Sequence, residues 1–127
     1  MRATTAGDAP PGLLRGLGDE RLAIALSLMH AHIERPWTVA QLARAAALSR
    51  SSFYERFTRT VGIAPMEYLL AWRMQVARQL LRQGGSRAAQ IAERVGYASA
   101  SAFSVAFRRH VGLAPGAYVR AQVADAS

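Results

Sequence analysis

The feature that most constrains the fold of this sequence is an internal repeat. Residues 53–68 read FYERFTRTVGIAPMEY, residues 103–118 read FSVAFRRHVGLAPGAY, and eight of the sixteen aligned positions are identical. Matching residues of the two copies are 50 positions apart over these stretches but 49 positions apart further upstream. The second copy therefore has one extra residue between Tyr97 and Ser101. A solenoid needs at least three repeats. The repeat therefore predicts two similar modules.

The stretch between the two copies predicts one long helix. Residues 66–83 read MEYLLAWRMQVARQLLRQ and consist largely of strong helix formers. Pro65 precedes the stretch and Gly84-Gly85 follows it, as is typical at the start and just past the end of a helix. At 1.5 Å per residue the predicted connector is roughly 27 Å long.

The first module is predicted to begin at Asp19, an N-cap, with a helix that Pro36 closes. Apolar residues at helical spacing give this helix one buried face: Leu22, Leu26, Met29 and Ile33. Thr38 and Gln41 fit a capping box for the next, short helix. Ser49 is predicted to cap a further helix over residues 50–60.

The buried face of the helix over residues 50–60 is predicted from Phe53 and Phe57, and Gly62 is predicted to end that helix. Two short helices joined by a tight turn form a helix-turn-helix. Residue types in the second copy predict the same order of elements. Ser86 is predicted to cap a short helix, Gly96 to make the turn and Ser99 to cap the next helix. In that helix Phe103 and Phe107 are predicted to point inward and Gly112 to end it, and Pro115 is predicted to start a final helix.

The predicted fold is all-α, with about seven helices and two helix-turn-helix subdomains joined by the connecting helix. The sequence predicts five divisions. They are a flexible tail or linker remnant with local docking by its leucines (1–18), a first subdomain (19–65), the connector (66–83), a second subdomain (84–121) and a C-terminal tail (122–127).

Composition narrows the function. The chain has no cysteine, which excludes disulfides and thiolate chemistry, and it shows no signal peptide or membrane span. Its three histidines are not spaced as a metal site, and no catalytic motif is present, so we expect no enzyme, metal or cofactor. The formal net charge is +8, carried by arginine alone. Arginine suits phosphate and guanine contacts; a GC-rich genome is the alternative explanation for its excess over lysine.

In a helix-turn-helix the second helix enters the major groove of DNA. Residues about 100° from the buried phenylalanines point outward and are candidates for base contacts: Arg50, Ser51, Tyr54, Glu55 and Thr58 in the first copy, and Ala100, Ser101, Ser104 and Val105 in the second. Arg50 suits guanine and Glu55 suits cytosine N4, whereas Ala100 and Val105 offer only apolar contacts. The second helix is therefore predicted to read bases more weakly. The alternative for each residue is an ordinary solvated surface.

Flanking polar residues are candidates for phosphate contacts, which add affinity without sequence information. They are Ser49, Arg56, Arg59, Arg73, Ser99, Arg108 and Arg109. For Arg73 the alternative is an internal pair with an acid such as Glu67.

Together these residues resemble the DNA-binding domain of AraC/XylS-type transcriptional regulators over about residues 22–120. The resemblance rests on Trp72-Arg73-Met74, Ile91-Ala92-Glu93-Arg94-Val95-Gly96-Tyr97, Phe107-Arg108-Arg109, Gly112-Leu113-Ala114-Pro115 and Tyr118. It implies two recognition helices that enter successive major grooves on one face of double-stranded DNA. The predicted connector is of the right order for one DNA turn of about 34 Å.

Three positions depart from the family pattern. Glu55 and Val105 stand where the family commonly has arginine, and Ala47 stands where it often has glycine, as at Gly96 in the second copy. A left-handed Ala47 would cost on the order of 1–2 kcal/mol.

The resemblance implies a cytoplasmic, nucleoid-associated, sequence-specific regulator, an activator that also contacts RNA polymerase. An upstream sensor domain is a further expected partner, since the linker-like composition of residues 4–12 favours a fragment over the alternative of a stand-alone member. The chain alone is expected to be a monomer. One alternative is a basic helical module that binds nucleic acid without sequence preference. Another is the regulatory half of a DNA-repair enzyme, although without cysteine this chain itself has no such alkyl acceptor.

Overall fold

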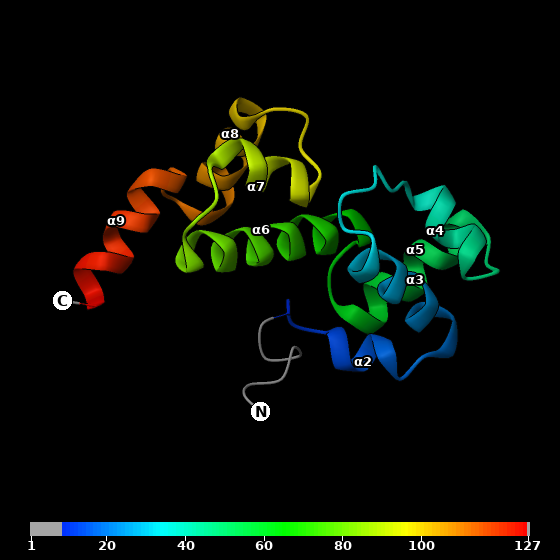
Figure 1. The fold of residues 1–127 in the computed structure, drawn as a ribbon. Helices are drawn as coiled ribbons and strands as arrows, with labels where there is room; N and C mark the ends of the chain where they lie inside the picture. Colours follow the sequence, from blue (N-terminus) through cyan, green and yellow to red (C-terminus); the bar gives the residue numbers. More distant parts are fainter. Residues whose placement is uncertain (1–8, 127) are drawn as a thin grey trace. The chain divides into compact units, whose positions relative to one another are not determined.

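A computed structural model describes residues 9–126; residues 1–8 and residue 127 lie outside the description. The described residues form eight α-helices and no strand, which confirms the predicted all-α class (Figure 1). The helices are α2 (Leu13–Leu17), α3 (Glu20–Ala31), α4 (Val39–Ala45), α5 (Arg50–Val61), α6 (Pro65–Gln83), α7 (Ala88–Val95), α8 (Ala100–Val111) and α9 (Pro115–Ala126).

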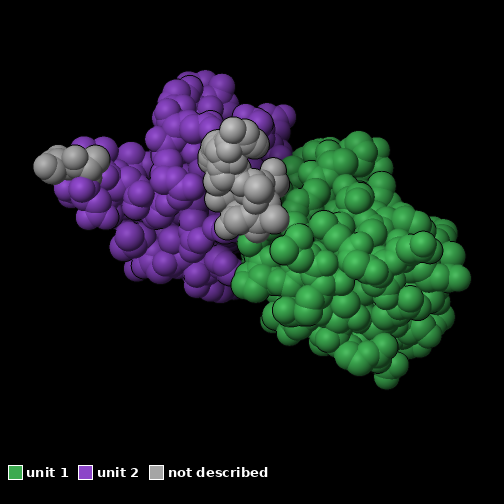
Figure 2. Space-filling view, turned by 90° about the horizontal axis from the view of Figure 1, so that it is seen from below, with its two compact units in different colours: residues 1–72 green, residues 73–127 purple. Residues whose placement is uncertain are grey.

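The chain divides into two compact units, Met1–Trp72 and Arg73–Ser127 (Figure 2). The connecting helix α6 contributes its residues up to Trp72 to the first unit and the rest to the second. Each unit contains one helix-turn-helix, formed by α4 and α5 in the first and by α7 and α8 in the second.

Each unit has its own core, and the two cores contain the same arrangement of aromatic side chains. Phe53 and Phe57 lie with ring centroids 5.6 Å apart, and Phe57 meets Tyr68 edge-on at 5.9 Å. In the second unit Phe103 and Phe107 are also 5.6 Å apart, and Phe107 meets Tyr118 edge-on at 5.6 Å. The repeat in the sequence is therefore a repeat of side-chain packing, with all four phenylalanines fully buried.

Most predicted helix caps are confirmed, and one is wrong. Asp19, Ser49 and Ser99 accept hydrogen bonds from the first turns of α3, α5 and α8, and Thr38 and Gln41 form the capping box of α4. The predicted cap Ser86 lies outside α7, whose N-cap is Arg87. The Arg87 backbone N–H donates to Gln90 Oε1 at 2.8 Å, because Gln90 occupies the repeat position of Gln41.

Helix α3 ends earlier than Pro36. It stops at Ala31 because His32 adopts a non-helical conformation, so Ile33 lies beyond the helix rather than on its buried face. The Trp37 indole N–H then donates to the His32 carbonyl at 2.9 Å, which holds the chain at this exit.

The ends of the described chain are more helical than predicted. Within the predicted tail, residues 13–17 form α2, and Leu13 is buried against α3 and α5. Residues 1–8 of that predicted tail lie outside the described residues. At the other end α9 continues to Ala126 instead of stopping near residue 121, since its last turns are rich in helix-forming alanine.

Ala47, in the turn between α4 and α5, has a φ of 58°, and among the described residues no other non-glycine residue has a positive φ. Its counterpart Gly96 has a φ of 98°. An alanine in this region costs roughly 1–2 kcal/mol relative to glycine, because its Cβ crowds the following carbonyl oxygen. The predicted strain at Ala47 is therefore present in the structure.

Ala47→Gly is expected to raise the free energy of unfolding by about 0.5–1 kcal/mol. The relief of strain is partly offset by the greater freedom of glycine in the unfolded chain. Urea unfolding followed by tryptophan fluorescence measures the change, because Trp37 and Trp72 both belong to the first unit. The control is the neighbouring Ala46→Gly, at a φ of −82°, which should lower stability. An unchanged or lower stability of Ala47→Gly would contradict the strain.

Candidate nucleic-acid interface

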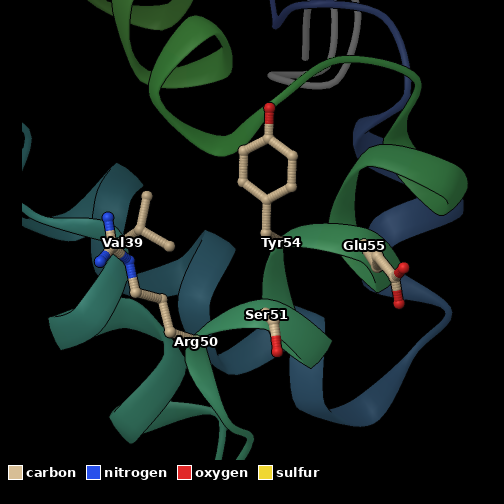
Figure 3. A pocket seen from close by; sticks show the side chains of 5 residues that line it. All are labelled: Val39, Arg50, Ser51, Tyr54 and Glu55. Carbon is tan, nitrogen blue, oxygen red and sulfur yellow. The ribbon is translucent and has the colours of Figure 1, made fainter.

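The exposed face of α5 forms the clearest candidate site. Arg50, Ser51, Tyr54 and Glu55 of α5 line a hollow of about 680 Å³ together with Val39 of α4 (Figure 3). The opposite face of α5 is fixed in the core by its phenylalanines. The structure therefore brings together four of the residues that the sequence predicted for base contacts.

These side chains offer a mixed set of donors and acceptors. The Arg50 guanidinium donates, the Glu55 carboxylate accepts, and the hydroxyls of Ser51 and Tyr54 do either. Within residues 9–126 none of the four forms an ion pair or a side-chain hydrogen bond. Tyr54 is 46% exposed although it is a large aromatic residue. The groups are therefore available to an external ligand. Val39, which the sequence argument missed, adds an apolar wall.

Thr58 differs from the other predicted base contacts. Its Oγ1 is buried and has no hydrogen-bond partner among the described residues. As a whole the Thr58 side chain is half-buried on α5, so its contact with a base stays a prediction.

The matching face of α8 is poorer in polar groups. Ser101 is exposed, Ala100 and Ser104 are half-buried, and Val105 is an exposed apolar residue with 58% of its surface accessible. The Ser99 hydroxyl oxygen accepts from the Ala102 backbone N–H at 3.1 Å, as the Ser49 hydroxyl oxygen accepts from Ser52 at 3.1 Å in α5. The helices are thus built alike but present different chemistry.

The arginines predicted to contact phosphate fall into two groups. Arg59, Arg108 and Arg109 are exposed on α5 and α8. Arg56 instead donates from Nε to Asp19 Oδ2 at 2.7 Å, and Arg73 lies over the Tyr97 ring, 5.8 Å from its centroid. Arg56 and Arg73 therefore already have partners inside their own units.

These two contacts affect the pKa values of Asp19 and Tyr97. The hydrogen bond from Arg56 is the largest cause of a lowered pKa at Asp19, with the capped backbone N–H groups of α3 adding to it. Burial raises the pKa of Tyr97, and Arg73 opposes that shift only in part. Both groups therefore keep their usual charge near neutral pH, which suits structural roles.

Charge is divided unevenly between the units. Residues 73–127 contain eight arginines and two acidic residues, whereas residues 1–72 contain eight arginines and six acidic residues. The formal net charges are therefore +6 and +2. This asymmetry is visible in the sequence once the division is known. The unit whose helix α8 presents fewer polar groups has the stronger positive charge.

His30 has a structural role. Its Nε2 lies 2.7 Å from the Tyr68 hydroxyl, and its ring stacks on Trp72 with centroids 4.1 Å apart. Burial lowers the pKa of His30, which favours the neutral ring in this stack. No group of three or more potential metal ligands occurs in the part of the chain that the structure describes.

Over residues 9–126, every helix is too short or too polar to cross a lipid bilayer.

Comparison with known proteins places these features in a family. A helix-turn-helix domain family matches residues 42–121. The chain is 50% identical over 113 residues to an AraC-like transcription regulator of Streptomyces antibioticus, covering 89% of this chain and 37% of that protein. It is 40% identical over 111 residues to the transcriptional regulator AlkR of Acinetobacter baylyi, covering 87% of this chain and 36% of that protein. The chain thus spans little more than a third of the length of these relatives.

Solved structures agree with this assignment. The DNA-binding domain of AdpA, solved with a target DNA, is similar with a TM-score of 0.78 and 32% identity, covering 84% of this chain and 96% of that one. An AraC-type regulator from Chromobacterium violaceum gives a TM-score of 0.72 and 32% identity, covering 81% and 92%. The chain belongs to the AraC family of transcriptional regulators, a DNA-binding family rather than an enzyme family, and its two helix-turn-helix units correspond to the family's DNA-binding domain.

Proposed function

We propose that this chain reads a bipartite DNA site by inserting α5 and α8 into successive major grooves. The observation that carries the proposal is a set of donors and acceptors on the exposed face of α5, at Arg50, Ser51, Tyr54 and Glu55, that have no ion-pair or side-chain hydrogen-bond partner among residues 9–126. The major groove is wide enough for an α-helix and displays a distinct pattern of groups for each base pair. The similarity to the AdpA domain, which was solved with a target DNA, supports the same use here.

Each side chain on α5 has a role that its chemistry favours. Arg50 forks onto guanine O6 and N7, Glu55 accepts from cytosine N4, and the hydroxyls of Ser51 and Tyr54 bond to a base or a phosphate. On α8, Val105 and Ala100 contact thymine methyl groups, and Ser101 and Ser104 supply hydroxyls. The first unit is then the main reader of sequence.

The second unit is then the main source of charge-driven affinity. Its net charge of +6, with Arg108 and Arg109 exposed on α8, favours contacts with phosphates, as does Arg59 in the first unit. Ser49 and Ser99 stand at the N-termini of the recognition helices, where phosphate oxygens are favoured. Such contacts fix the position of the protein on the duplex.

A module that binds nucleic acid without sequence preference is the weaker alternative. Positive charge alone is sufficient for such binding. It does not require a mixed donor and acceptor set on α5, nor two helix-turn-helix units with capped recognition helices. Family membership also favours specific recognition.

We further propose that the chain acts in the cytoplasm as part of a transcriptional activator that contacts RNA polymerase. Support comes from RclR of Escherichia coli, a transcriptional activator that is 43% identical over 82 residues, 65% of this chain and 29% of that protein. The test is transcription in vitro from a promoter that carries the selected site. Activation predicts more transcript with the protein than without it, whereas a repressor would lower the yield.

Insertion into the major groove is tested with modified guanines at the selected site. Replacing guanine with 7-deazaguanine removes the N7 acceptor in the major groove, and replacing it with inosine removes the N2 donor in the minor groove. The proposal predicts a loss of affinity with 7-deazaguanine at the base that Arg50 reads and little change with inosine. The reverse pattern would exclude insertion of α5 into the major groove.

Arg109→Gln is expected to weaken binding to all DNA sequences by a similar factor. Removing one phosphate contact should reduce the slope of log K against log salt by about 0.9, with sequence preference unchanged. Fluorescence anisotropy at several salt concentrations measures this slope. The control is Arg120→Gln, which removes the same charge from the exposed surface of α9 in the same unit. A slope that falls equally in both variants would argue against a specific contact by Arg109.

A further inference from the structure

We propose that residues 12–21 brace the first recognition helix, with Arg15, Asp19 and Arg21 as positioning residues for base readout by α5. The inference rests on the proposed function, because it concerns how α5 is held while it reads DNA. These three residues do not lie on the proposed DNA face. Each of them instead contacts α5 or the turn that precedes it.

Arg15 holds the C-terminal end of α5. Its Nε donates to the Thr60 carbonyl at 3.0 Å and its Nη2 donates to the Val61 carbonyl at 3.1 Å. The last carbonyls of a helix have no partner within the helix, and a cation is favoured at that end. One side chain therefore satisfies two carbonyls and ties α2 to α5.

The backbone of α2 comes close enough for this contact because of two glycines. A Cβ at Gly12 would lie 2.0 Å from the Val61 carbonyl oxygen, and Gly12 also has a φ of 94°. A Cβ at Gly16 would lie 2.5 Å from Leu26 Cδ1 and 3.0 Å from Val61 Cγ2. Larger residues at either position would push α2 away from the end of α5.

Asp19 holds the middle of α5. It caps α3 by accepting from the backbone N–H groups of Arg21 and Leu22 through Oδ1, at 3.0 Å and 3.2 Å. Its other oxygen accepts from Arg56 Nε at 2.7 Å. The start of α3 and the centre of α5 are therefore joined through one carboxylate.

Arg21 holds the start of the recognition helix. Its Nη1 donates to the carbonyl of Ala47, the strained residue in the turn before α5, at 2.5 Å. The brace thus contacts the turn before α5 and the middle and the end of α5 itself. A base contact depends on sub-ångström placement of the helix, so these anchors act on readout through position.

The second copy lacks one of these anchors by sequence. The repeat position of Arg56 is Ala106, which has no group to pair with an acid. The complete brace therefore belongs to the first unit, which also contains the polar hollow on α5. Helix α8 serves as an internal reference in the test.

The test compares Arg15→Met, Asp19→Asn and Arg21→Met with the unchanged protein in the full chain. For each protein, affinity is measured for the selected DNA site and for a panel of its single-base variants. We expect discrimination at the bases read by α5 to fall about five- to tenfold, a part of what one good base contact provides. Discrimination at the bases read by α8 should stay the same.

A purely structural role gives a different result. A lower folded fraction weakens binding to every sequence by one factor and leaves the ratios between sequences unchanged. Trp37→Phe is the matched control, because it removes a hydrogen bond to His32 in the same unit and leaves the hydrogen bonds of Arg15, Asp19 and Arg21 in place. Arg15→Lys keeps a donor at this position and should restore part of the discrimination. It also replaces Arg15→Met if that variant does not fold.

Two outcomes overturn the inference in distinguishable ways. If the unchanged protein discriminates between sequences but all brace variants keep its ratios, the brace has no role in readout while the proposed function stands. If the unchanged protein itself shows no discrimination, the proposed function fails and the brace fails with it.

Discussion

Phe57→Ala is expected to lower the free energy of unfolding of the first unit by about 3–5 kcal/mol. The ring is fully buried, lies 5.6 Å from Phe53 and meets Tyr68 edge-on at 5.9 Å. Truncation removes these contacts and leaves a cavity that rigid helices fill only in part. A unit of 72 residues has a total stability of roughly 4–11 kcal/mol, so the variant is close to unfolding.

Urea unfolding monitored by tryptophan fluorescence measures this loss, because both tryptophans lie in the first unit. The control is Ser52→Ala, on the exposed face of the same helix, which should change stability by less than about 0.5 kcal/mol. A cost below about 1 kcal/mol for Phe57→Ala would mean that the aromatic core described here does not hold the first unit together.

Arg50→Ala is expected to relax the DNA preference at one base position and to leave the others intact. A bidentate arginine contact with guanine provides about 1–3 kcal/mol of discrimination, which corresponds to roughly 5- to 150-fold in relative affinity. Arg50 is exposed at the first position of α5 and has no ion-pair partner among the described residues. Removal of the Arg50 side chain is therefore expected to remove the base contact without destabilising the fold.

Competition binding with all four bases at each position of the selected site measures the change. Arg44→Ala is the matched control, since it removes the same charge from the last turn of α4 in the same unit. It should lower affinity for all sequences alike, if at all. Equal loss of affinity for every base in Arg50→Ala would show that Arg50 contacts a phosphate instead of a base.

Much of the fold was predictable because its signals are local. Helix caps, the spacing of Phe53 and Phe57, and the repeat all lie within a few residues of the elements they define. The cap at Arg87 was also within reach, since the offset of 49 that aligns Gln41 with Gln90 also aligns Thr38 with position 87. Ser86 was predicted as the cap instead, because serine is a favoured N-cap residue. Helix α2 was missed because its five residues are too few to show a repeated helical pattern and include Gly16, and because the burial of Leu13 depends on contacts distant in sequence.

The candidate site was predictable where it depends on helix geometry alone. The 100° turn per residue placed Arg50, Ser51, Tyr54 and Glu55 on one face. It could not orient a hydroxyl that rotates about χ1, as at Thr58, whose Oγ1 is buried. Nor could it show that Arg56 pairs with Asp19, 37 positions away in the sequence. Partners of this kind depend on tertiary packing, and no local pattern records them.

Selection from a random pool of double-stranded DNA is the direct test of specific recognition by α5 and α8. If both helices read DNA, we expect an enriched bipartite site whose half-sites lie about one helical turn, 10–10.5 base pairs, apart. The half-site read by α5 should be the better defined, and the winner should bind at least about 10³-fold more tightly than random DNA. Enrichment of no motif, with affinity that simply falls as salt rises, would contradict specific reading and leave only charge-driven binding.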